Sequence, residues 1–191
     1  MQKYTDLYDV LIIGAGPAVS NAAISYKKLN PTLKVGLIDK AVFPRDKSCG
    51  DAIGPGVISA LKRFNNEHIL DGEPQVVSTT LYGPDNIGIQ NYIPEVKNKE
   101  DSIVYVIPRV DLDNRILDLA KECGVDVYEG YSFVDFTSNL DKSLNVQIKN
   151  ENENLEFLTK ILVGADGANS RIRKKLSYKS NSDWHKAIAI R

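Results

Sequence analysis

The sequence predicts an α/β fold in which helices and an antiparallel β-meander accompany a central parallel sheet. Residues 8–13 and 34–38 are short apolar runs of the kind found in buried strands, and residues 155–163 have the content of a further strand. The first and last of these segments each end at a glycine-rich turn that opens a helix. Strands that alternate with helices indicate parallel pairing, because parallel neighbours need a crossover connection.

The other elements follow from local patterns. Glycine and proline in the polar loop at residues 40–56 argue against regular structure there. Residues 111–123 have apolar side chains at helical spacing, with Asp111 as a cap, Gly124 as a stop and Cys123 in the core. The remaining predicted elements are a helix at 57–64; an inserted sheet within about 74–107, with strands at 76–82, 87–93 and 103–107; a strand at 125–128; a meander of strands at 132–137, 144–149 and 155–163; and a strand at 186–191.

The first glycine turn has the spacing of a Rossmann-like dinucleotide-binding unit. Gly14 permits a tight turn after the strand, and Gly16 lets the backbone approach a pyrophosphate at the positive N-terminus of the next helix. Pro17 suits the first helical turn. Val19 stands where the fingerprint has a third glycine, so we expect the helix to be lifted slightly from the strand, unless neighbouring small residues make room.

The second strand ends at Asp39. An acid at this point accepts hydrogen bonds from the ribose hydroxyls of an adenosine half, and it repels a 2′-phosphate. The alternative is an acid that merely starts a loop. The neighbouring Gly-x-Gly turn favours the dinucleotide.

The second glycine turn follows residues 155–163. A strand there delivers Asp166 to the turn, Gly167 allows close approach of the backbone, and Asn169 or Ser170 can cap the following helix. Taken alone, this motif is equally well explained as an ordinary strand-to-helix turn. As the partner of Gly14 and Gly16, it favours a flavin over a nicotinamide cofactor.

Composition narrows the function class. The chain has 191 residues, 24 Lys and Arg against 25 Asp and Glu, and a net charge of −1, so no overall field favours nucleic acid. The basic run at 171–175 is interpreted as a solvated helix face. Two cysteines form no disulfide framework, His68 and His185 have no partner at metal-ligand spacing, and no signal peptide or transmembrane segment is expected. We therefore expect a cytoplasmic protein without a metal.

Five motifs in order resemble the geranylgeranyl reductase family, which sits within the flavoproteins that resemble aromatic hydroxylases. The motifs are Gly-x-Gly-Pro-Ala at 14–18, Asp-Lys at 39–40, Phe-Pro-Arg-Asp-Lys-Ser-Cys-Gly-Asp at 43–51, Pro-Arg-x-x-Leu-Asp at 108–113, and Gly-Ala-Asp-Gly-Ala-Asn-Ser-x-x-Arg at 164–173. The resemblance covers nearly the whole chain. It implies FAD as the cofactor and residues 1–191 as the N-terminal part of an FAD-binding domain.

The resemblance also implies roles for single residues. The cofactor-binding residues with an implied place are Gly14, Gly16 and Pro17 at the pyrophosphate, Asp39 at the adenosine ribose, Arg109 at the phosphates or a neighbouring part of the cofactor, Asp166 near the ribityl chain and pyrophosphate, and Cys49 in the loop that borders the isoalloxazine and the substrate. The cofactor-binding set also includes Ala18, Lys40, Gly50 and Gly167. Lys47 and Cys49 are the catalytic candidates, on the wall that faces the substrate. A thiol flanked by Lys47 is expected to have a lowered pKa, although a small packing residue at position 49 is nearly as good an explanation.

The implied activity is reduction of carbon–carbon double bonds in an isoprenoid chain by hydride transfer from reduced flavin, with NAD(P)H or ferredoxin as electron donor. If the substrate is a lipid, the protein is expected at a membrane surface. One alternative is an aromatic monooxygenase or halogenase, although Trp184, the only tryptophan, gives no tryptophan-paired halogenase motif. A second alternative is a truncated flavin-binding module without independent catalysis, because family members carry a later Gly-Asp motif and a substrate-binding region, whose start we place at 180–191.

Overall fold

The computed structural model describes residues 7–92 and 104–176, and it confirms the predicted α/β class. The chain divides into two compact units, one of residues 1–46 with 113–191 and the other of residues 47–112. The strand predicted at 186–191, together with residues 93 and 103 of two other predicted strands, lies outside the described residues.

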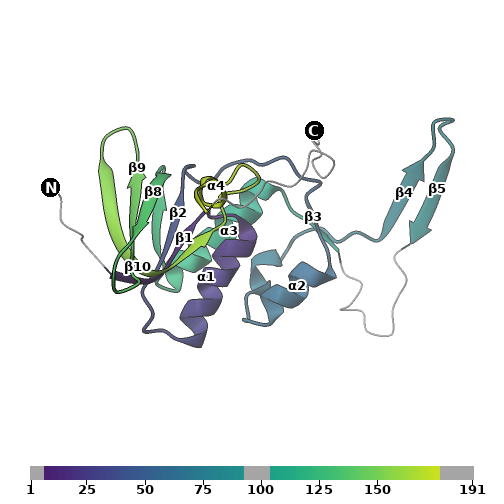
Figure 1. Ribbon diagram of the computed structural model, residues 1–191. Coiled ribbons are helices and arrows are strands. Elements are labelled where there is room, and N and C mark those ends of the chain that lie inside the picture. The colour runs from purple at the N-terminus through teal and green to yellow at the C-terminus, as the bar shows by residue number, and fades with distance from the viewer. Residues whose placement is uncertain (1–6, 93–103, 177–191) are drawn as a thin grey trace. The chain divides into compact units, whose positions relative to one another are not determined.

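The first unit is built on a six-stranded sheet of order β7-β2-β1-β10-β9-β8. The four strands from β7 to β10 run parallel, whereas β9 and β8 continue the sheet antiparallel as the predicted meander. Helices α1 and α3 lie on one side of the parallel strands, and the meander lies on the other (Figure 1). The bounds are β1 Leu7–Ile13, β2 Val35–Asp39, β7 Asp126–Glu129, β8 Ser132–Ser138, β9 Leu144–Lys149, β10 Asn154–Gly164, α1 Pro17–Leu29, α3 Arg109–Glu122 and α4 Arg171–Lys175.

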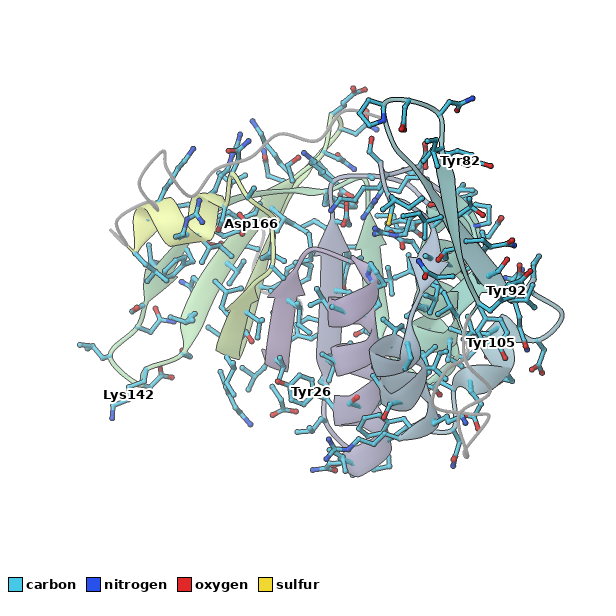
Figure 2. The ribbon with its side chains drawn as sticks, turned by 90° about the vertical axis from the view of Figure 1, so that its right-hand side faces the viewer. Tyr26, Tyr82, Tyr92, Tyr105, Lys142 and Asp166 are labelled. Carbon is cyan, nitrogen blue, oxygen red and sulfur yellow. The ribbon has the colours of Figure 1, made fainter. Side chains whose placement is uncertain are left out.

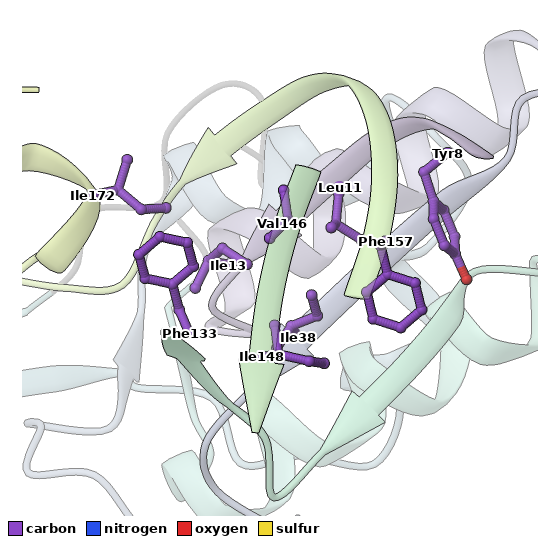
Figure 3. Packing of buried hydrophobic residues seen from close by; sticks show 9 residues of the cluster. All are labelled: Tyr8, Leu11, Ile13, Ile38, Phe133, Val146, Ile148, Phe157 and Ile172. Carbon is purple, nitrogen blue, oxygen red and sulfur yellow. The ribbon is translucent and has the colours of Figure 1, made fainter. Parts of the chain in front are cut away.

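The meander closes one face of the sheet through a continuous apolar core (Figure 3). Tyr8 and Phe157 meet edge to face, with ring centroids 5.6 Å apart. The buried Tyr8 hydroxyl is hydrogen-bonded to the Asp126 carboxylate and to the Tyr128 hydroxyl, each at 2.8 Å, so its polar end is satisfied. The nine buried residues of this core are Tyr8, Leu11, Ile13, Ile38, Phe133, Val146, Ile148, Phe157 and Ile172.

Helix α1 packs through small side chains. Ser20, Ala23 and Ile24 are fully buried, whereas Val19 is only half-buried. The backbone N–H groups of Val19 and Ser20 both donate to the Gly16 carbonyl at 3.0 Å, so the first turn is regular. This arrangement favours the alternative in which neighbouring small residues make room for the valine.

We therefore expect Val19→Gly to leave FAD affinity unchanged or to weaken it, rather than to tighten it. Glycine in a helix costs up to about 1 kcal/mol relative to a residue with a side chain, and no compensating gain in packing is available. Calorimetric titration of both forms with FAD checks this. A glycine variant that binds FAD about tenfold more tightly would show that the valine does displace the helix.

The second unit contains β3 Ala52–Ile53, α2 Pro55–Lys62, the 3-10 helix η1 Glu67–Leu70, β4 Ser78–Tyr82, β5 Gly88–Tyr92 and β6 Tyr105–Val106. Two expectations need correction here. The segment 40–56 is not without regular structure, because it contains β3 and the first residues of α2. The described strands also form two separate pairs, β3 with β6 and β4 with β5, instead of one inserted sheet.

Helix α3 begins earlier than its sequence pattern predicts. It starts at Arg109, and Asp111 lies in the first turn instead of capping the helix. The Pro108 carbonyl accepts the N–H groups of both Asp111 and Leu112 at 3.0 Å. Gly124 follows the helix with a φ of +80°, as expected for a glycine stop. Cys123, however, is partly exposed and is not a core residue.

No helix among the described residues is both long enough and apolar enough to span a bilayer.

Candidate functional site

Three turns meet where the parallel strands β1, β2 and β10 reach their carboxyl ends. The Gly14 N–H donates to the Ile38 carbonyl at 2.7 Å, and the Ala165 N–H donates to the Ile13 carbonyl at 2.8 Å. These bonds join residues 14–18, residue 39 and residues 164–167 into one set, here called the cradle. The carboxyl edge of a parallel sheet is where α/β folds bind their ligands.

The two glycines of the first turn have different tasks. Gly14 has a φ of +113°, and a Cβ placed on it would lie 2.4 Å from the Ala165 carbonyl oxygen. A side chain at Gly14 is thus excluded by both the backbone conformation and the neighbouring turn. A Cβ on Gly16 would meet nothing within 4 Å, and its φ of −68° suits any residue. The absence of a side chain at Gly16 leaves open space in front of α1, as the approach of a pyrophosphate requires.

Within residues 7–92 and 104–176, no side chain caps the N-terminus of α1. The Ala18 N–H belongs to the first turn, where backbone donors lack a partner within the helix. Such donors, with the positive end of the helix dipole, bind phosphate groups. Pro17 has no N–H and fits the start of the helix.

Asp39 stands at the end of β2 with both carboxylate oxygens engaged. Its Oδ2 accepts the Ala15 N–H at 2.8 Å, and its Oδ1 accepts the Ala41 N–H at 2.9 Å. These bonds fix the carboxylate against the first glycine turn. A carboxylate offers about four acceptor positions, so capacity remains for a ribose hydroxyl.

The Asp166 carboxylate, which follows β10 (labelled in Figure 2), is the clearest test of whether a ligand with hydroxyl donors fits the cradle. Its Oδ2 accepts the Arg171 N–H at 2.6 Å, whereas its Oδ1 is buried and finds no hydrogen-bond partner among the described residues. An unsatisfied buried acceptor costs about 1–3 kcal/mol, which a hydroxyl donor from the ribityl part of a flavin would recover. Gly167, with a φ of +83° and open space around its Cβ position, leaves room for such a donor. As predicted, Ser170 caps α4, with its Oγ accepting the Arg173 N–H at 3.0 Å.

Lys40 follows Asp39 in the first unit and is exposed, and the second unit holds the remaining predicted site residues, Lys47, Cys49, Gly50 and Arg109. Hydrogen bonds from the Asp51 backbone N–H and from the Arg109 guanidinium lower the pKa of the Cys49 thiol. The lowered pKa agrees with the sequence-based expectation, but its cause is Arg109 and a backbone amide instead of Lys47. Cys49 is partly exposed, and Lys47 is exposed.

We expect Arg109→Met to raise the pKa of Cys49 and to slow its alkylation by iodoacetamide near neutral pH. The thiolate is the reactive form, and removal of the cation and its hydrogen bond disfavours that form. The rate of alkylation measured against pH should shift to higher pH in this variant and stay in place in Arg63→Met, a control that removes another cation of the same unit. Equal profiles for wild type and Arg109→Met would refute the assignment.

One partly buried ion pair was not predicted from the sequence. The Arg45 guanidinium lies 3.6 Å from the carboxylate of Asp113, and the Asp113 side chain is fully buried. Asp113 is the first residue of α3 that belongs to the first unit. Arg45 also stacks on the Phe43 ring at 4.7 Å, and the Phe43 N–H donates to the Glu129 carboxylate at 2.8 Å. Two of the resemblance motifs therefore meet here, and the segment after Asp39 is tied to α3 and β7.

The fold and the cradle define an α/β flavoprotein whose site suits a dinucleotide with a ribityl chain. The FAD binding domain family matches residues 7–188, and the chain belongs to this family. FAD is its cofactor.

Relatives of the chain include reductases. The chain is 29% identical to the menaquinone reductase of Mycolicibacterium smegmatis over 187 residues, which is 96% of this chain and 43% of that protein. It is also 29% identical to the geranylgeranyl diphosphate reductase of Rhodobacter capsulatus over 171 residues, 88% of this chain and 40% of that protein. The chain thus spans less than half the length of these relatives.

Solved structures show the same fold. A geranylgeranyl bacteriochlorophyll reductase-like protein from Thermoplasma acidophilum matches with a TM-score of 0.69 and 25% identity, over 85% of this chain and 40% of that one. The flavin-dependent halogenase CmlS matches with a TM-score of 0.75 and 24% identity, over 91% of this chain and 32% of that one.

Proposed function

We propose that the chain is the FAD-binding part of a reductase that saturates carbon–carbon double bonds of an isoprenoid chain. The observation that carries the proposal is the set of sequence relatives named geranylgeranyl diphosphate, digeranylgeranylglycerophospholipid and menaquinone reductases, at 26–29% identity. Each of these relatives is named after a molecule that carries a prenyl chain. The five motifs at 14–18, 39–40, 43–51, 108–113 and 164–173 support the same family.

When bound, reduced FAD supplies the hydride. In this proposal the residues of the chain bind and orient: the N–H groups at Gly16 and Ala18 hold the pyrophosphate, Asp39 the adenosine ribose, and Asp166 the ribityl chain. Lys40, Gly50, Gly167 and Arg109 belong to the proposed cofactor-binding set. Hydride addition to one carbon of a double bond requires a proton at the other carbon. Lys47 and Cys49 each carry a transferable proton, and we place both beside the substrate.

The proposal extends to partners and to the rest of the protein. The electron donor is NAD(P)H or ferredoxin, and the protein works in the cytoplasm, at a membrane surface when its substrate is a lipid. We place the start of a substrate-binding region at residues 180–191, which lie outside the described residues. On its own, the 191-residue chain would then bind FAD weakly and would not turn over prenyl substrates.

The proposed function can be tested with a chimera in which this chain replaces the matching N-terminal part of the Rhodobacter capsulatus geranylgeranyl diphosphate reductase. Under anaerobic conditions the dithionite-reduced chimera should be reoxidised by geranylgeranyl diphosphate, and the product should gain one pair of hydrogens for each reduced double bond. A chimera that binds FAD stoichiometrically yet is reoxidised only by oxygen would contradict the proposal.

The alternative function is that of an aromatic monooxygenase or halogenase. Whether the reaction requires oxygen distinguishes this alternative from the proposed reductase. The fold is shared with CmlS and with p-nitrophenol 4-monooxygenase of Pseudomonas putida, which matches at a TM-score of 0.78 and 14% identity. Similarity at this level concerns the fold alone, so the reaction of the flavin with oxygen must be measured. Substrate-stimulated oxygen consumption with hydroxylated or halogenated product would establish the alternative.

A further inference from the structure

The segment after Asp39 stays attached to the sheet through the turn after β7. Asp39 and Glu129 are register partners at the ends of the parallel strands β2 and β7. The pairing continues past both ends, because the Tyr131 N–H donates to the Asp39 carbonyl at 3.0 Å. One step further on, the Gly130 N–H donates to the Ala41 carbonyl at 3.1 Å. Residues 129–131 therefore lie beside the residue that the proposed function assigns to the adenosine ribose.

The Glu129 side chain binds the same segment at a further point. Its Oε1 accepts the Phe43 N–H at 2.8 Å. Its Oε2 lies 3.2 Å from the ammonium group of Lys121 in α3. A hydrogen bond to a carboxylate is about twice as strong as one between neutral groups, so the backbone at Phe43 is held firmly. The Glu129 side chain is only 23% exposed, which limits competition from water for this bond.

Apolar packing does not hold this segment in place. The Val42 side chain is 68% exposed, and Ala41 and Phe43 are only half-buried. Polar bonds at residues 41, 43 and 45 hold it instead. In a segment this open, packing does not compensate for the loss of the bond between Phe43 and Glu129.

The same segment fixes the carboxylate of Asp39. The Oδ1 atom accepts the Ala41 N–H at 2.9 Å, and the Oδ2 atom accepts the Ala15 N–H at 2.8 Å. Ala41 lies two residues from Phe43, so a displacement of Phe43 carries the Ala41 amide with it. Oδ1 then loses its bond, and the carboxylate can turn about the bond that Oδ2 keeps. An acceptor that is fixed beforehand binds its ligand more tightly, because less freedom is lost on binding.

We propose that Glu129 is a positioning residue for the adenosine half of FAD. Through residues 41–43 it keeps the Asp39 carboxylate in the orientation that accepts the ribose hydroxyls, without itself touching the cofactor. Glu129 belongs to none of the five motifs, so sequence spacing gives no sign of this role. The inference rests on the role of Asp39 in the proposed function, and it is independent of the reaction that the flavin performs.

Four variants separate the parts of this arrangement. Glu129→Ala removes the acceptor for the Phe43 N–H. Glu129→Gln keeps an oxygen that can accept this N–H but loses the charge. Lys121→Met removes the ion pair with Glu129 and leaves the bond to Phe43. Glu156→Ala is the control for a lost carboxylate, because Glu156 accepts a hydrogen bond from the Gln147 side chain instead.

The first measurement compares the affinities for FAD and FMN by calorimetric titration. FMN lacks the adenosine half, so we expect Glu129→Ala to weaken FAD binding about tenfold and to leave FMN binding unchanged. The other three variants should keep the preference of the wild type for FAD. A loss of affinity shared equally by both flavins would refute the positioning role, since it indicates general damage to the fold. A Glu129→Gln variant as impaired as Glu129→Ala would refute the part played by the Phe43 bond.

Comparison with Asp39→Ala separates this inference from the proposed function. If Asp39→Ala loses the preference for FAD and Glu129→Ala keeps it, the inference about Glu129 fails alone. If the wild type has no preference for FAD over FMN, the role of Asp39 fails together with it.

The second measurement needs no flavin. Hydrogen exchange of the Phe43 amide should be at least about tenfold faster in Glu129→Ala than in the wild type and should return toward the wild-type rate in Glu129→Gln. Exchange of residues 35–38 in β2 should not change, because the strand itself keeps its partners on both sides. Equal exchange of the Phe43 amide in wild type and Glu129→Ala would show that Glu129 does not hold the segment, and the proposal would fail.

Discussion

Gly14→Ala should destabilise the chain by about 3 kcal/mol and abolish FAD binding at the same time. The backbone at this residue has a φ of +113°, which costs an alanine about 1–3 kcal/mol, and the new methyl would lie 2.4 Å from the Ala165 carbonyl oxygen. Relief of this clash separates the turn after β1 from the turn after β10, which together hold Asp166 in the cradle. Urea unfolding followed by circular dichroism measures the loss of stability.

Gly16→Ala is the matched control, because its Cβ would meet nothing within 4 Å. We expect an unchanged unfolding free energy together with about tenfold weaker FAD binding, since the methyl occupies the approach to the pyrophosphate. If Gly16→Ala unfolded as easily as Gly14→Ala, or if it bound FAD normally, the division of roles between the two glycines would be wrong.

Arg45→Met should cost about 2–3 kcal/mol of stability. The substitution removes the Arg45 guanidinium from beside the fully buried Asp113 carboxylate, and methionine retains much of the apolar contact with the Phe43 ring. The loss should concentrate in residues 40–46, which this ion pair ties to α3. Thermal unfolding and amide exchange of that segment measure the two effects.

Arg45→Lys serves as the comparison for the ion pair. Lysine keeps the positive charge but lacks the planar guanidinium, so we expect an intermediate loss of stability. A methionine variant that is as stable as the wild type would mean that the pair at 3.6 Å contributes nothing to the fold.

Much of the fold could be predicted because its strands have strong local patterns. Strands β1, β2, β9 and β10 lie within one residue of their predicted bounds, since apolar runs bounded by glycine or polar turns define them. Strands β3 and β6 have two residues each and exist through their pairing with one another. No periodicity can be read from two residues, so the regular structure within 40–56 was missed.

The candidate site shows the same division between local and long-range information. Spacing alone pointed to Gly14, Gly16, Asp39 and Asp166, because each follows a predicted strand. The contact between Gly14 and Ala165, the ion pair of Arg45 with Asp113 and the bond of Arg109 to Cys49 join residues distant in sequence. Such contacts depend on how the elements pack, which a single sequence does not specify.

Calorimetric titration of the chain with FAD, FMN and NAD tests the cradle most directly, with Asp39→Ala as the comparison. The account predicts measurable binding of FAD and weaker binding of FMN, because FMN lacks the adenosine ribose whose hydroxyls donate hydrogen bonds to Asp39. The Asp39→Ala variant should lose this preference for FAD. Clear affinity for NAD with none for FAD would contradict the account.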